Sequence, residues 1–261
     1  MHLNGFDGKG INIAVIGKPI LVARKLFSGK IIIEKVTTSC DDSLEGNVVI
    51  DDIYNILPNA KIHYYTESIN HDSREVVMSR LDLLQKIISY NYSVSLEERI
   101  KVVALNTSLL YHNRHLYDDS EVKSILAALR NNLKEQNCFL FDPSEFYKYF
   151  LEQTPIFNES LSSIIDFKYI PKDQNRSTQN KVLVPGNRRL NIVNETDDVR
   201  RVYRGTTYYG WSTPIIAAIF AYAKVLSPEI TYKRFFELAY ETGDKYNKIP
   251  VINMYNLIKS L

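Results

Sequence analysis

The sequence is poor in the features that mark several classes of protein. It has two cysteines, Cys40 and Cys138, in 261 residues. Two thiols so far apart in the chain cannot form the disulfide framework of a small secreted domain, and they lack the paired spacing of a zinc site. Basic and acidic residues nearly balance, at 32 and 30. This balance argues against a nucleic-acid-binding protein, because such proteins usually carry a concentrated basic face.

Long apolar runs and targeting segments are also missing. The longest nearly uninterrupted apolar stretch, residues 214–226, falls short of the ~20 residues that span a membrane. The first residues lack the charged, apolar and small-residue pattern of a signal peptide. We therefore expect a cytoplasmic protein without membrane segments. Because 45% of the residues are hydrophobic and no repeat divides the chain, we expect one domain over residues 1–261.

What the chain does contain is an alternation of short apolar segments with segments of helical periodicity. Strands are predicted at residues 11–16, 61–65, 101–105, 138–141, 164–167 and 181–184. Helices are predicted around residues 76–88, 122–133, 231–240 and 251–261, and another from Pro214 onward. Asp119 or Ser120 is the expected cap of the second helix. Such alternation is typical of a three-layer α/β fold with a mainly parallel central sheet.

Loops are predicted over roughly residues 37–47, 143–163 and 172–180. In an open parallel sheet, ligands bind in the crevice beyond the carboxyl ends of the strands. These loops are therefore candidate walls of a binding site, or else plain surface connections.

Six segments, taken in order, carry a resemblance to a known family. They are residues 8–16 (GKGINIAVI), 57–62 (LPNAKI), 103–109 (VALNTSL), 182–186 (VLVPG), 205–218 (GTTYYGWSTPIIAA) and 249–257 (IPVINMYNL). Each is similar to a motif of the subtilase family of serine proteases, and together they cover nearly the whole chain. The resemblance implies a subtilisin-like fold, and it implies where a catalytic site would lie.

At those implied positions the chain departs from the family. The aspartate of a Ser-His-Asp triad should follow the first strand, where Gly17 stands. Glu45 corresponds to the histidine, and Gly210 corresponds to the serine, four residues before the proline of the Thr-Pro pair. Ser144 corresponds to the asparagine that holds the oxyanion. Because triad members act as a unit, the three changes remove the basis for peptide hydrolysis by this mechanism.

The neighbouring residues are bulkier than the family's pattern. Leu110 and Tyr111 stand where a glycine is expected, and they would fill the first specificity pocket. Tyr208, Tyr209 and Trp211 lie beside the implied cleft. Tyr and Trp are common anchors at interfaces, so these three form the preferred contact patch; alternatively, they plug the cavity that the triad leaves.

Besides a purely structural subunit that uses the fold as a packing block, two functions follow from these patterns. The first is a catalytically inactive subtilisin-like pseudoprotease that binds a protein or peptide partner, such as an active protease or a peptide-tailoring enzyme. The alternative is a serine-type hydrolase with a rebuilt site that uses Glu45 as base and Ser144 or Ser212 as nucleophile. No cofactor or metal is expected, and His63 is interpreted as an interior residue whose ring nitrogens are satisfied.

Overall fold

The computed structural model of the chain describes most of the predicted core. The described residues are 7–20, 31–33, 45–67, 74–109, 116, 118–143, 150–153, 182–185, 190–196, 198–203, 209–246 and 249–261.

Five parallel strands form the central sheet. They are β1 (Asn12–Gly17), β2 (Ile31–Ile33), β3 (Lys61–Thr66), β4 (Val102–Leu105) and β5 (Phe139–Phe141). Their order is β2-β3-β1-β4-β5, and every pairing is parallel. The direction of winding therefore reverses between β1 and β4, which is where an open α/β sheet forms its ligand crevice. Four of these strands confirm the predictions to within about two residues.

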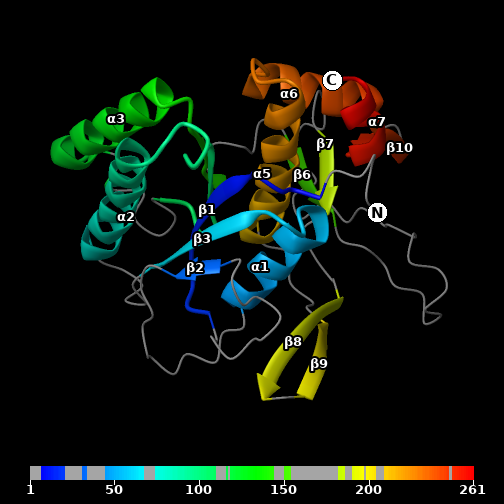
Figure 1. Cartoon of the computed structure of the whole chain (residues 1–261), viewed down its shortest axis with the longest axis horizontal. Helices are drawn as coiled ribbons and strands as arrows, with labels where there is room; N and C mark the ends of the chain where they lie inside the picture. Colours follow the sequence, from blue (N-terminus) through cyan, green and yellow to red (C-terminus); the bar gives the residue numbers. More distant parts are fainter. Residues whose placement is uncertain are drawn as a thin grey trace.

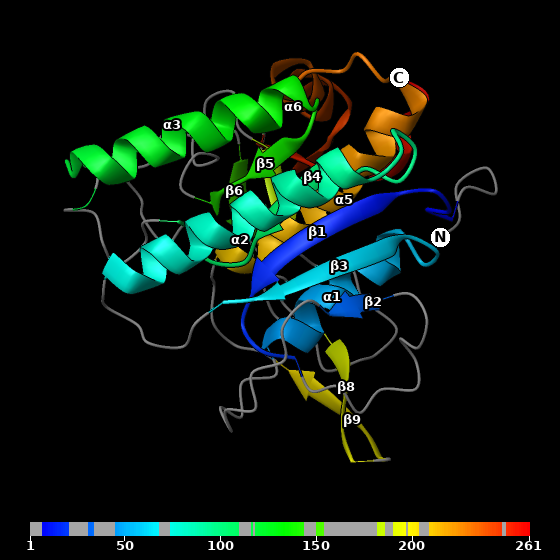
Figure 2. The same cartoon turned by 60° about the vertical axis from the view of Figure 1, so that its left-hand side comes forward.

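Helices cover both faces of this sheet (Figures 1 and 2). They are α1 (Glu45–Ile56), α2 (Arg74–Ser93), α3 (Ser120–Glu135), α5 (Tyr209–Leu226), α6 (Tyr232–Thr242) and α7 (Met254–Lys259). Along β1, Ala14 and Ile16 face the core shared with α2 and α3, whereas Ile13 and Val15 face the core shared with α1 and α5. The predicted three-layer α/β architecture is therefore confirmed, with strands that are mostly apolar because both of their faces are buried.

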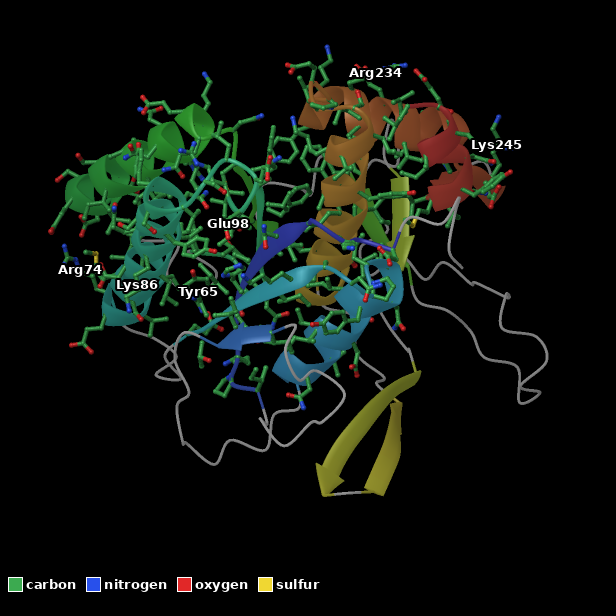
Figure 3. All side chains as sticks on the ribbon, in the orientation of Figure 1. Tyr65, Arg74, Lys86, Glu98, Arg234 and Lys245 are labelled. Carbon is green, nitrogen blue, oxygen red and sulfur yellow. The ribbon has the colours of Figure 1, made fainter. Side chains whose placement is uncertain are left out.

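Asp119 is the cap of α3, as predicted. Its side chain accepts hydrogen bonds from the backbone N–H groups of Glu121 and Val122. On the outer surface of the α6 side, Arg234 and Lys245 extend away from the core (Figure 3). Within the described ranges, no helix combines the length and the apolar character that crossing a membrane requires.

Three sequence expectations on element boundaries are wrong. The loop predicted over residues 37–47 is too long, because α1 already begins at Glu45. A strand, β6 (Phe150–Gln153), lies inside the loop predicted over residues 143–163. The helix predicted to open at Pro214 begins at Tyr209, so this proline is internal. Having no N–H, Pro214 leaves the carbonyl of Gly210 without its usual helical donor.

Beyond the central sheet lie two smaller ones. A four-stranded sheet has the order β10-β11-β7-β6, and an antiparallel pair, β8 with β9, projects from the body near α1 (Figure 1). Their further strands are β7 (Val182–Pro185), β8 (Leu190–Thr196), β9 (Asp198–Tyr203), β10 (Asp244–Tyr246) and β11 (Ile249–Val251). The strand predicted at residues 164–167 lies outside the described residues.

Candidate functional site

The candidate site lies at the carboxyl ends of β1, β3 and β4, where the winding of the sheet reverses. Gly17 is the last residue of β1, and its carbonyl accepts a 2.8 Å hydrogen bond from the N–H of Glu67. The N–H of Asn106 donates to the carbonyl of Ile16 at 2.9 Å. These bonds extend the sheet by a residue beyond β3 and β4, so the side chains that follow the strands are held at fixed positions.

Gly17 has no room for a side chain. A Cβ on this residue would lie 2.8 Å from the hydroxyl oxygen of Tyr64 and 3.1 Å from the Cβ of Asn106. Tyr64 is fully buried, and its hydroxyl donates to the carbonyl of Lys18 at 2.6 Å. The space beside the end of β1 is therefore filled by a phenol that is hydrogen-bonded in place.

Gly46 meets the same phenol from the side of α1. A Cβ on Gly46 would lie 2.6 Å from the Tyr64 hydroxyl, 2.6 Å from the Lys18 carbonyl and 2.5 Å from a methyl group of Ile20. Two glycines, one on β1 and one on α1, thus allow Tyr64 to occupy the gap between them. Sequence reasoning missed both Gly46 and Tyr64, although Gly46 directly follows the predicted Glu45.

On the opposite face, towards α2, the polar groups form a closed network. Glu67 and Arg80 are buried and form an ion pair with 2.7 Å between Oε2 and Nε. The hydroxyl of Thr107 donates to the other carboxylate oxygen of Glu67 at 3.2 Å. Arg80 also donates through Nη1 to the carbonyls of Ser108 at 3.0 Å and Leu109 at 3.3 Å. Buried charges need such partners, because an unpaired one is very costly.

The same network reaches the end of β5. Asp142 is buried, and its carboxylate accepts the N–H of Leu109 at 3.3 Å. With both carbonyls of residues 108 and 109 bonded to Arg80, the backbone of this segment is engaged by the protein itself.

Two polar side chains at the end of β4 are left unpaired. Asn106 is fully buried, and among the described residues neither its Nδ2 nor its Oδ1 has a hydrogen-bond partner. The hydroxyl of Ser108, which is 2% exposed, also has none in the part of the chain that the structure describes. Burying such a group without a partner costs about 1–3 kcal/mol, so native proteins seldom retain them without a use.

His63 shows a similar deficit, and the prediction for it is half wrong. The residue is fully buried on β3, as expected, but neither ring nitrogen has a hydrogen-bond partner within the described ranges. Its ring packs against Tyr90 with 4.8 Å between centroids. Burial lowers the pKa of His63 to about 4, and the charge of Lys61 acts in the same direction.

The remaining predicted site residues are only partly described. Glu45 is the first residue of α1, and Gly210, between Tyr209 and Trp211, is in the first turn of α5. Leu110, Tyr111, Ser144 and Tyr208 lie outside the described residues. Ser212, the other candidate nucleophile, is fully buried in α5.

The described residues provide no set of side chains that could hold a metal ion. No three His, Cys, Asp or Glu residues lie close enough together there to hold an ion. Burial raises the pKa of the Cys138 thiol to about 12, so this thiol stays protonated and behaves as a small apolar side chain.

This chain is similar to known proteins in its structure and not in its sequence. No family model matches the chain, and no curated protein is similar to it in sequence. Among solved structures, the protease domain of PatA aligns with a TM-score of 0.58 at 13% identity, covering 99% of this chain and 98% of that chain. The prenylagaramide maturation protease PagA aligns with a TM-score of 0.57 at 12% identity, over 96% of this chain and 92% of its own.

A third solved structure concerns the assembly of the subtilase cytotoxin SubAB. It aligns with a TM-score of 0.60 at 11% identity, covering 97% of this chain and 90% of that chain. The chain therefore has a subtilisin-like fold, as the sequence resemblance implied.

Proposed function

We propose that this chain is a catalytically inactive protein of subtilisin-like fold that binds a protein partner. The observation that carries the proposal is the filled space beside Gly17. A triad aspartate at this position would need the volume that Tyr64 occupies, since even a Cβ would come within 2.8 Å of its hydroxyl oxygen. Without an oriented carboxylate and a histidine, a serine cannot be activated by the triad mechanism.

The alternative, a rebuilt serine hydrolase, is disfavoured by the burial of Ser212. A nucleophile must reach a substrate carbonyl, whereas this side chain has no exposed surface and lies within α5. A hydrolase built on Ser144 and Glu45 remains the arrangement that the experiment below must exclude.

The backbone after β4 favours a folded partner over an extended peptide substrate. A peptide that adds a strand to a protein needs free N–H and C=O groups along the receiving segment. Here the N–H of Leu109 is bonded to Asp142, and the carbonyls of Ser108 and Leu109 are bonded to Arg80. We assign the contact patch to Tyr208, Tyr209 and Trp211 with Leu110 and Tyr111, because the first three are of the residue types that anchor interfaces.

The test is hydrolysis of a fluorogenic peptide library by the natural chain, together with labelling by a fluorophosphonate serine probe and with subtilisin as a positive control. We expect neither turnover nor labelling. The variant Gly17→Asp/Glu45→His/Gly210→Ser should also be inactive, and adding Tyr64→Ala should be required before any activity returns. Turnover by the natural chain that Ser144→Ala or Ser212→Ala abolishes would overturn the proposal and establish a rebuilt hydrolase.

A further inference from the structure

The antiparallel pair of β8 and β9 has an edge that the described part of the chain leaves unused. β8 is the strand that lies next to α1, and β9 lies on its far side in both views (Figures 1 and 2). No further described strand pairs with the outer edge of β9. In an antiparallel pair, every second residue directs its backbone N–H and C=O away from the partner strand. The outer edge of β9 is therefore a row of donors and acceptors that another strand can use.

The sequence and position of β9 suit it to receive a strand. Its six residues, DVRRVY, include no proline and no lysine, which commonly protect an exposed edge. A sheet of two strands is only marginally stable, and a third strand stabilises it. β9 ends at Tyr203, and residues 204–208 connect it to α5, which begins with Tyr209 of the proposed contact patch. The edge and the patch are thus joined by a short segment of chain.

The charges of this segment indicate which strand would bind. Residues 188–204 contain five arginines and three acidic residues. The acidic residues all fall at positions 195–198, where the chain passes from β8 to β9, whereas Arg200 and Arg201 lie in the middle of β9. Opposite charges on neighbouring strands stabilise their pairing, and like charges destabilise it. The edge therefore favours a strand with acidic residues at two successive positions.

A second copy of the chain fits this edge less well. If β9 paired antiparallel with β9 of a copy over all six residues, Arg200 of each chain would lie opposite Arg201 of the other. Two like-charge pairs at the centre would destabilise this arrangement. Charged residues on an edge strand are a common protection against self-association, so the arginines favour a different protein as the partner.

We infer that the outer edge of β9 binds an acidic edge strand of the protein partner by antiparallel strand addition. This inference rests on the proposed function and names the segment that the partner supplies. Backbone hydrogen bonds hold the added strand, and Arg200 and Arg201 select its carboxylates. The segment after β4 cannot take this role, because the N–H of Leu109 and the carbonyls of Ser108 and Leu109 are already bonded within the protein.

The test measures hydrogen exchange of the β9 amides in the full chain by ¹H–¹⁵N NMR, with and without the extended peptide N-acetyl-TVEEVT-amide. In the free chain, alternate amides of β9 should exchange fast, because only the others donate to β8. We expect the acidic peptide to slow these fast amides, because they then donate to the added strand. The peptide N-acetyl-TVKKVT-amide should leave them fast.

A charge reversal sharpens this test. In Arg200→Glu/Arg201→Glu, binding of the acidic peptide should weaken about tenfold, and the lysine peptide should now slow the same amides. Slow exchange of alternate β8 amides shows that the hairpin is intact in this variant. The matched control is Lys86→Glu/Lys245→Glu, which makes the same change in charge at two exposed lysines elsewhere (Figure 3). It should bind the acidic peptide as the natural chain does.

Three results would overturn the inference. Slow exchange of every β9 amide in the free chain means that the edge is already occupied, by a second copy if dilution restores fast exchange and by this chain if it does not. An acidic peptide that leaves the fast amides fast means that no strand is added. Equal effects of the two peptides mean that charge does not select the partner. Hydrolysis of the fluorogenic library by the natural chain would overturn the proposed function, and it changes none of these exchange rates.

Discussion

The two faces of the central sheet differ in how they treat the polar groups beyond β1, β3 and β4. On the α2 face, the side chains of Glu67, Arg80 and Thr107 are bonded to one another. Arg80 also donates hydrogen bonds to the carbonyls of Ser108 and Leu109. On the α1 face, Gly17 offers no side chain, Tyr64 fills the gap, and Asn106 is left unpaired.

This difference predicts that substitutions of polar residues cost more stability on the α2 face than on the α1 face. The closed network stabilises the end of the sheet, so substitution within it should be costly. On the α1 face, the described residues around Gly17, Tyr64 and Asn106 do not form one hydrogen-bonded network. The closed network therefore stabilises the α2 side of the strand ends, whereas the described residues form no such network on the α1 side.

The largest effect is expected for Arg80→Met. The change leaves the Glu67 carboxylate buried without its cation and frees two carbonyls, so the free energy of unfolding should fall by about 3–5 kcal/mol. Urea unfolding measures this value. Glu67→Leu combined with Arg80→Met should recover most of the loss, because no unpaired charge is then buried.

The matched control for this variant is Arg234→Met. Arg234 lies on the exposed side of α6, 3.5 Å from Glu241, with half of its side chain in solvent (Figure 3). Its removal should cost less than about 1 kcal/mol, as for other surface pairs. Equal losses in Arg80→Met and Arg234→Met would show that the network does not stabilise the sheet.

Substitution of the two buried asparagines should have unequal effects on stability. Asn91→Leu leaves the backbone N–H and C=O of Ile100 without their hydrogen-bond partner, so it should lower the free energy of unfolding by about 2–3 kcal/mol. Asn106→Leu removes a carboxamide that has no partners, and it should be neutral or stabilising. Urea unfolding of the two variants side by side gives the comparison, and a similar loss in both would mean that Asn106 is satisfied in solution.

Gly17→Ala probes the packing of Tyr64 directly. The added methyl group would lie 2.8 Å from the Tyr64 hydroxyl oxygen, and such overpacking typically costs about 1–3 kcal/mol. Tyr64→Phe in the same chain removes that oxygen and should recover part of the loss. Gly10→Ala serves as a control, because its cost arises from a φ of +85° with nothing nearby, so Tyr64→Phe should leave it unchanged. Additive effects of Gly17→Ala and Tyr64→Phe would argue against the contact.

The fold was more predictable than the site, for physical reasons that particular residues make clear. β1 and β4 are buried on both faces, so they appear in the sequence as continuous apolar runs that can be recognised locally. β2, with three isoleucines, is too short to distinguish from other apolar fragments. The start of α1 falls within the loop predicted over residues 37–47, although Val49, Ile53 and Ile56 have helical spacing.

The site depends on contacts between residues that are distant in the chain. Gly17 could be singled out because it directly follows a strand, a position that sequence defines. Tyr64 could not be, because its hydroxyl bonds to the carbonyl of Lys18, 46 residues earlier. For the same reason nothing in the sequence paired Arg80 with Glu67, and nothing distinguished the bonded Asn91 from the unbonded Asn106.

The smallest effect is expected for His63, a buried residue of β3 on the α2 face whose ring nitrogens have no hydrogen-bond partner among the described residues. Its pKa in the folded chain is lowered by burial to about 4, below the value of 6.5 for a free histidine. As the pH falls below 6.5, the unfolded chain takes up a proton that the folded chain does not, so stability is lost until the pH reaches the folded pKa. Between pH 7 and pH 5 this loss should be about 1–2 kcal/mol.

The variant His63→Phe keeps a ring against Tyr90 and removes the titration. Urea unfolding at both pH values should show that the variant loses less stability than the natural chain on acidification, while the contribution of the carboxylates is common to both. An identical loss in the two proteins would mean that His63 takes up its proton without unfolding, and hence that a buried partner, or water, reaches its ring nitrogens. In that case His63 would be hydrogen-bonded in the folded chain, and the contrast with Asn106 on the other face would become sharper.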